Sequence, residues 1–257
     1  MADNCDQLLP RGADAPYLLL CGCDPLGQNS GNLEQALRHM GLVPTAGEAV
    51  DCDAQDFSGQ SFHIKLGDQK ARVGFAAAAL VDEAYCHAET LWAGTRVAAD
   101  DGKFTRAVLL KPAWEPSTDL IIASREFFKL AVLLIDLMGA DQLFWSPARL
   151  WSDAGAFRAA VVEMLDSGMP PLLHLMAFQD MPGGGMATRG LAFFSKQELH
   201  LMGGNGLERK DAVRRLARLA LDIMVHGPIV AQRRFPGLVE GEHLRLVQPP
   251  GQMVPAY

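Results

Sequence analysis

Strand-like segments occur in this chain in two settings, in adjacent pairs and singly between helical segments. Residues 62–66 alternate between apolar and polar side chains, a glycine–aspartate pair supplies a turn, and residues 71–80 resume a strand pattern, which predicts a hairpin. Residues 107–110 and 143–145 are single apolar runs between helical segments. Paired strands break the strict alternation that a doubly wound parallel sheet requires. We therefore expect an α+β fold, with a mixed or largely antiparallel sheet and helices packed on it.

The other elements follow from the periodicity of the apolar residues. Helical spacing predicts helices at residues 32–40, 124–138, 153–166 and 208–226. Apolar runs predict further strands at residues 17–21, 171–178, 191–194, 198–202, 229–235 and 244–247. The third and fourth of these strands are expected to form a hairpin. Residues 76–79 are compatible with either a strand or a helix, and Asp153 is expected to cap the third helix.

The length of 257 residues fits one large domain or two small ones. Residues 1–15 mix Asp, Gly and Pro without periodicity, which predicts a flexible tail. The alternation of strands and helices becomes cleaner near residue 105. We therefore expect an N-terminal α+β half at residues 16–104 and a C-terminal α+β half at residues 105–257, and the length also fits two halves of similar fold.

The charge of the chain limits its partners. Asp and Glu number 30 against 23 Lys and Arg, so the formal net charge is −7. The excess of acids belongs to the first part of the chain. Nucleic acids and anionic lipids both favour a positive field, so a nucleic-acid-binding role is not expected. The preferred partner class is another protein.

Neither a targeting segment nor a cofactor site is expected. The first residues include Asp3 and Asp6 where a secretory signal needs a positive start and an apolar stretch. The most apolar run, residues 130–140, contains Asp136 and is too short to cross a membrane. The five cysteines lack zinc-type spacing. We therefore expect a cytoplasmic protein with reduced thiols, no metal, no cofactor and no membrane association.

Several residue clusters resemble catalytic or ligand sites without completing one. Cys86, His87 and Glu89 follow two acids, but adjacent side chains usually point apart, whereas a catalytic Cys–His pair must meet in space. The glycines at residues 183–185 and 203–206 lack the ending of a phosphate loop, so linkers or turns are favoured. Four further polar residues lack a triad pattern, and the two histidines among them lie in apolar segments typical of core positions: Ser146, Ser195, His174 and His200.

Two surface features could bind a partner. One side of the helix predicted at residues 208–226 carries a positive stripe: Lys210, Arg214, Arg215 and Arg218, with Arg233 and Arg234 as further candidates. This stripe is either a solvated helix face or a docking surface for an acidic protein or an RNA backbone. Met181 and Met186 flank the triple glycine and are candidates for an exposed contact. The tryptophans either belong to the core, which is the usual case, or line an apolar groove: Trp92, Trp114, Trp145 and Trp151.

Three segments of the second half resemble a bacterial family known as domain of unknown function 4261. The first runs from a helix end at residues 137–140 into a strand at residues 144–146. The second is residues 188–194, which contain a Thr-x-Gly-Leu pattern, and the third is residues 197–200. The likeness covers about residues 105–240. The residues that carry it most clearly are Trp145, Thr188, Gly190, Leu191 and Glu198.

The resemblance implies an α+β fold and a bacterial, cytoplasmic setting, and it implies no activity. The chain departs from similar proteins at Ser195, where a glycine usually follows the paired phenylalanines. A turn is therefore expected to differ there.

Two functional hypotheses follow. The first is a non-enzymatic protein-binding module of the accessory or toxin-neutralising type, which engages another protein through an acidic surface of the first half or through the positive stripe. The second is an enzyme or small-molecule binder with a cleft between the two halves, since interdomain crevices are common pocket positions.

Overall fold

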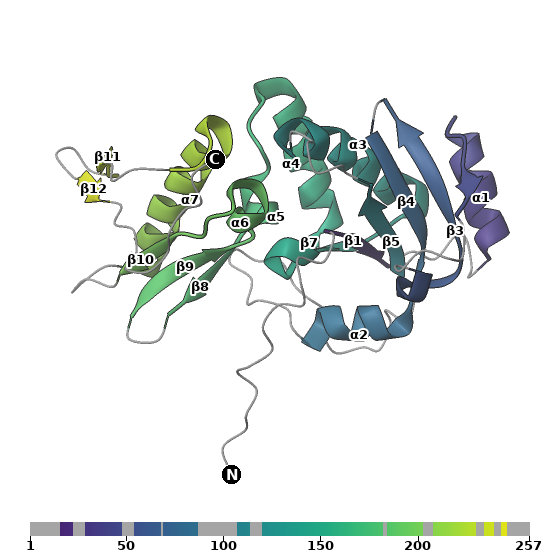
Figure 1. Cartoon of the computed structure of the whole chain (residues 1–257), viewed down its shortest axis with the longest axis horizontal. Coiled ribbons are helices and arrows are strands. Elements are labelled where there is room, and N and C mark those ends of the chain that lie inside the picture. The colour runs from purple at the N-terminus through teal and green to yellow at the C-terminus, as the bar shows by residue number, and fades with distance from the viewer. Residues whose placement is uncertain are drawn as a thin grey trace, which may run out of the picture.

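The computed structural model describes residues 16–22, 29–47, 54–67, 69–86, 107–113, 120–181, 184–202, 208–229, 234–238 and 243–245. The predicted tail at residues 1–15 lies outside this set. Figure 1 shows helices packed on a large sheet, with a smaller sheet beside it.

The large sheet contains seven strands in the order β2-β3-β4-β5-β1-β6-β7. Every neighbouring pair in it is antiparallel, which confirms the predicted α+β class with a largely antiparallel sheet. The predicted hairpin is β3 with β4. The strands are β1 (Leu18–Cys21), β2 (Thr45–Ala46), β3 (Phe57–Leu66), β4 (Gln69–Ala76), β5 (Ala107–Pro112), β6 (Gln142–Trp145) and β7 (Leu150–Asp153).

Helices cover both faces of this sheet, as Figure 1 shows. Alternating residues of β1 explain why: Leu18 and Leu20 join one apolar core, whereas Leu19 and Cys21 join the other. The larger core includes residues of α1 (Ser30–His39), α3 (Leu120–Met138) and α4 (Ala154–Ser167). The smaller core includes α2 (Ala78–Cys86), so the ambiguous residues 76–79 mark the end of β4 and the start of a helix.

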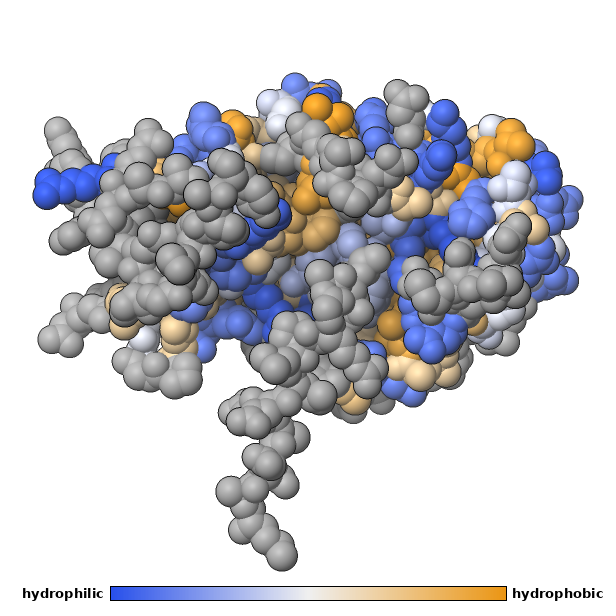
Figure 2. All heavy atoms as spheres, in the orientation of Figure 1, coloured by the Kyte–Doolittle hydropathy of each residue, from blue (hydrophilic) through white to orange (hydrophobic). Residues whose placement is uncertain are grey.

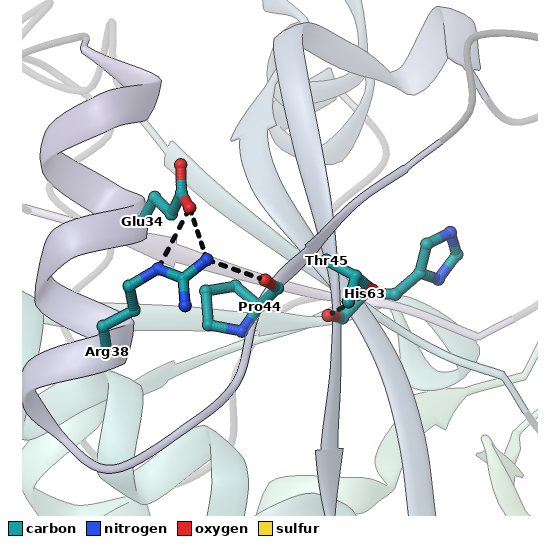
Figure 3. Close-up of polar contacts among 5 residues, drawn as sticks. All are labelled: Glu34, Arg38, Pro44, Thr45 and His63. Atoms are coloured by element: carbon teal, nitrogen blue, oxygen red, sulfur yellow. Dashed lines mark hydrogen bonds and ion pairs between the residues drawn. The ribbon is translucent and has the colours of Figure 1, made fainter.

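Local interactions fix the ends of these helices. Asp153 caps α4 as predicted, because its Oδ1 accepts a hydrogen bond of 2.7 Å from the Ala156 amide. Figure 3 shows how the C-terminal turn of α1 is tied to the start of β2. The Arg38 guanidinium donates to Glu34 on the same helix and to the carbonyl oxygen of Pro44, at 3.3 Å. The Thr45 hydroxyl then donates to the carbonyl oxygen of His63 on β3.

The predicted boundary between residues 104 and 105 runs through this sheet. β1 comes from the N-terminal side and pairs with β5 on one side and β6 on the other, and both of these strands come from the C-terminal side. β7 was not predicted. It follows directly after a 3-10 turn, and its four residues run straight into the cap of α4.

The smaller sheet has the order β10-β9-β8 and also pairs in antiparallel fashion. A third, two-stranded sheet is also antiparallel. The predicted helix at residues 208–226 agrees closely with α7. The elements are α5 (Leu172–Leu175), β8 (Ala177–Asp180), β9 (Gly185–Arg189), α6 (Leu191–Ser195), β10 (His200–Met202), α7 (Arg209–His226), β11 (Arg234–Pro236) and β12 (His243–Arg245).

Two predicted strands in this region are wrong. Residues 171–178 contain the short helix α5 before β8, and residues 191–194 belong to α6, so the strand that pairs with β10 is β9. The Glu198 carboxylate stabilises α6 by accepting hydrogen bonds from the amides of Gly190 and Ala192. A cap supplied from beyond the helix leaves no trace in the hydrophobic pattern.

Candidate protein-binding surface on helix α7

Helix α7 is amphipathic, and one side of it is fixed in the core. Its buried residues pack toward α5, α6 and β9. These residues repeat at helical spacing: Ala212, Val213, Leu216, Leu219, Ala220, Ile223 and Met224. The core therefore determines which side chains of α7 face outward.

Three of the four predicted stripe residues share one outward row. Lys210, Arg214 and Arg218 are exposed and follow one another at four-residue spacing, which places them on one side of the helix. We call these three residues the basic row. Arg215 is half-buried and lies about 100° round the helix from Arg214, outside the row. Arg234 is exposed on β11, and Arg233 lies outside the described residues.

The basic row is weakly neutralised by its neighbours. Arg214 Nη1 lies 3.7 Å from Asp211 Oδ1, and both side chains are largely exposed. Arg218 Nη1 donates to the carbonyl oxygen of Gly237 at 2.9 Å. Among the described residues, Lys210 has no ion-pair partner. Helix α7 carries five bases and two acids in a chain whose net charge is −7. It is a local positive surface on an acidic protein.

A groove continues from the end of the basic row. It has a volume of about 360 Å³, and Arg218 is one of its lining residues. We call it the α7 groove. Its lining is mainly apolar: Met169, Leu219, Leu221, Val225 and Phe235, with Arg218, Asp222 and His226.

The α7 groove is open to solvent. Val225 is 54 % exposed and Met169 is 44 % exposed, whereas Leu219 and Phe235 are buried and form the floor. At the C-terminal end of the helix, His226 Nδ1 lies 3.0 Å from Asp222 Oδ1. Pockets for small molecules usually bury most of the ligand surface. An open groove of this size suits side chains presented by a larger partner.

Sequence reasoning missed the apolar part of this surface. Leu221 and Val225 lie on the outward side of α7 that carries the basic row, and their place on the helical wheel was the available signal. Met169 and Phe235 come from separate segments, the turn after α4 and the strand β11. No local pattern in the sequence brings them to α7.

The two methionines proposed as exposed contacts are placed differently. Met186 is 1 % exposed, so its prediction as a surface contact is wrong. It lies in β9, the central strand of the smaller sheet, and belongs to the main core beside α7 residues. Met181 is half-buried, and its amide donates to the carbonyl oxygen of Gly185 at the β8–β9 turn.

The five residues on which the resemblance mainly rests are called the family-like motif here, and three of them, Thr188, Gly190 and Glu198, form a compact polar cluster. Glu198 Oε2 accepts from the Thr188 hydroxyl at 2.7 Å, and Glu198 Oε1 accepts from the Gly190 amide at 2.8 Å. The Thr188 hydroxyl oxygen in turn accepts from the Leu199 amide at 2.8 Å. The carboxylate and hydroxyl thus satisfy backbone donors inside the fold, which is a structural role.

The other motif residues connect this cluster to the large sheet. Leu191 is fully buried. Trp145 of β6 is also fully buried, and its ring packs edge-to-face on Phe193, with centroids 5.5 Å apart. Ser195 is the last residue of α6, and its hydroxyl donates to the carbonyl oxygen of Leu191. The left-handed residue of the turn is Lys196, with φ 57°, so a glycine is not required at position 195.

Among the residues that the structure describes, the remaining candidates do not come together as a catalytic site. Cys86 is exposed at the end of α2, but His87 and Glu89 lie outside the described residues. The Ser146 hydroxyl accepts from the Tyr17 amide and so holds the start of β1. His174 is half-buried, and burial lowers its pKa. His200 is exposed on β10, so its expected core position is wrong.

The structure describes only some of the glycines and tryptophans that the sequence analysis singled out. Gly184 and Gly185 adopt positive φ in the β8–β9 turn, whereas residues 182–183 and 203–207 lie outside the description. Trp145 and Trp151 are buried, which confirms the core interpretation for these two, and Trp92 and Trp114 lie outside the described residues. In the described part of the chain, no group of three or more His, Cys, Asp or Glu residues could hold a metal ion.

Comparisons of the chain with protein-family models, curated proteins and solved structures give no match. Within the ranges described above, no helix combines the length and hydrophobicity needed to cross a bilayer.

Proposed function

We propose that this chain is a non-enzymatic protein-binding module that uses the outward face of α7. The supporting observation is that the basic row runs directly into the α7 groove, since Arg218 belongs to both. A protein interface typically combines two parts. Charged residues steer the partner during the encounter, and neighbouring apolar residues lose their water on binding.

The setting of α7 in the fold also supports this proposal. The helix is anchored along its buried side, so its outward side chains are presented on a rigid element. Rigid presentation lowers the ordering cost of association. On the face that Figure 2 shows, hydrophobic residues form patches between hydrophilic areas. Scattered patches of that kind are normal on protein surfaces.

We further propose a cytoplasmic location and an accessory or toxin-neutralising role, which rest on the composition of the chain and on its resemblance to the bacterial family. The alternative of an enzyme with a cleft between two halves has less support. The α7 groove lies wholly within residues 169–235, and therefore within the C-terminal half and not between the two halves.

The proposal is tested with two double charge reversals. Lys210→Glu/Arg214→Glu alters the basic row, and Lys70→Glu/Arg158→Glu alters two exposed bases on β4 and α4. Both pairs change the net charge equally. Affinity purification from the native bacterium, followed by binding measurements on the purified complex, should show a partner that the first variant loses and the second retains.

The expected loss of affinity is about tenfold or more, because each reversal replaces an attraction by a repulsion. Retention of every partner by the Lys210→Glu/Arg214→Glu variant would refute a role for α7. Circular dichroism checks that both variants fold. Glu near the N-terminus of α7 is compatible with the helix dipole, so this variant should fold normally.

A further inference from the structure

We infer that the segment bound on α7 is an amphipathic helix of another protein, with acidic residues in one half and large apolar residues in the other. This inference rests on the proposed function and specifies the chemistry of the partner. It follows from the order of side chains along the outward face of α7.

The basic half of this face repeats at helical spacing. Lys210, Arg214 and Arg218 are each four residues apart, and such neighbours on a helix lie about 5–6 Å from one another. Acidic residues at the same spacing on a second helix can therefore face all three bases. The positive end of the α7 dipole lies at the same end of the helix and adds to the attraction.

The apolar half follows one turn later. Leu221 and Val225 continue the outward face, and Met169 and Phe235 form walls and floor beside them. From residue 210 to residue 225 the helix rises about 22 Å, which is roughly four turns. A partner helix of similar length would place acids over the basic row and apolar side chains in the α7 groove, as in other helix-in-groove complexes.

Charge argues against two other occupants. A two-fold dimer with parallel α7 helices would bring two basic rows together, which like-charge repulsion disfavours, and one with antiparallel helices would place each basic row over apolar residues and leave its bases without acids. RNA would meet a protein whose net charge is −7 and a groove whose lining is mainly apolar. An acidic amphipathic helix fits both halves of the face.

The probe is a synthetic four-turn helical peptide with Glu at every fourth position in one half and Leu on the same face of the other half. Three matched peptides replace Glu by Lys, Leu by Gln, or one mid-helix residue by Pro. Binding to the full chain is measured by fluorescence anisotropy at low and high salt.

We expect the first peptide to bind and each altered peptide to bind at least about tenfold more weakly. On the protein, Lys210→Glu/Arg214→Glu should weaken binding about tenfold or more, and the loss should shrink at high salt. Val225→Asp should weaken binding similarly, whereas Val162→Asp, at a comparably exposed valine of α4, should change it less than about twofold.

Equal binding of the Lys or Pro peptide, absence of binding by the first peptide, or a preference for an RNA oligonucleotide would each overturn the inference. So would a dimer that Lys210→Glu/Arg214→Glu disrupts. The two proposals fail separately. A native partner that requires α7 but binds through an extended segment overturns only this inference, whereas a native partner indifferent to α7 overturns the proposed function.

Discussion

At the scale of single residues, Gly190 shows how the family-like motif is used. Its φ is +101°, and a Cβ added there would lie 2.6 Å from the carbonyl oxygen of Leu175 and 2.8 Å from the Ala148 side chain. Backbone freedom and close approach are therefore both required at this position. The motif residue joins α6 to α5 and to the turn that follows β6.

We predict that Gly190→Ala destabilises the protein by about 3 kcal/mol, since both the left-handed conformation and the clash are unfavourable. The matched control is Gly168→Ala. Gly168 also has positive φ, but a Cβ there meets nothing within 4 Å, so the cost should be only about 1 kcal/mol. Urea unfolding measures both, and equal losses would contradict the packing role assigned to Gly190.

His174 should make stability depend on pH. Burial lowers its pKa in the folded protein, although the nearby Asp153 carboxylate opposes the shift, and the ring packs edge-to-face on Phe157. The unfolded chain therefore binds a proton more readily, with a pKa near 6.5. This contribution to stability is fully present above about pH 6.5. It is lost as the pH falls from there toward the lowered pKa of His174 in the folded protein.

The measurement is the free energy of unfolding in urea at about pH 5 and about pH 7.5. His174→Gln should reduce the loss of stability between the two conditions, because the titrating group is gone. His200→Gln, at an exposed histidine, should leave that loss unchanged. A pH dependence that persists in His174→Gln would assign the effect to other groups.

At the scale of elements, helix ends in this fold depend on single side chains. The Asp153 carboxylate accepts from the Ala156 amide at the start of α4, so Asp153→Ala should cost about 1 kcal/mol of stability. Asp166→Ala, at an exposed position near the C-terminal end of the same helix, should be neutral or slightly stabilising because an acid is unfavourable there. Thermal unfolding of both variants checks the cap, and similar losses for the two would contradict it.

Long periodic elements could be predicted from the sequence, and short ones could not. The β3–β4 hairpin, α3 and α7 carry enough repeats for their periodicity to be decisive. By contrast, α5 and α6 have four and five residues, and α6 depends on the Glu198 carboxylate. The same distinction applies to the site. Spacing identified the basic row, but the walls of the α7 groove come from segments that only the tertiary fold brings together.

At the scale of the whole molecule, acidic and basic residues are unevenly distributed along the chain. The five bases of α7 lie on a protein whose net charge is −7. This uneven distribution can orient an approaching partner before contact. It also explains why the overall composition argued against nucleic-acid binding yet could not identify the positive face.

The central place of β1 has a consequence for the growing polypeptide. Leu18 pairs with Leu110 on one side and with Trp145 on the other. β1 therefore cannot complete its pairing until β5 and β6 have left the ribosome, which happens much later. Until residue 145 has emerged, the apolar Leu-Leu-Leu-Cys segment of β1 has an unpaired backbone edge, which can pair with other chains. Nascent chains halted before β6 should therefore need chaperone protection that full-length chains do not.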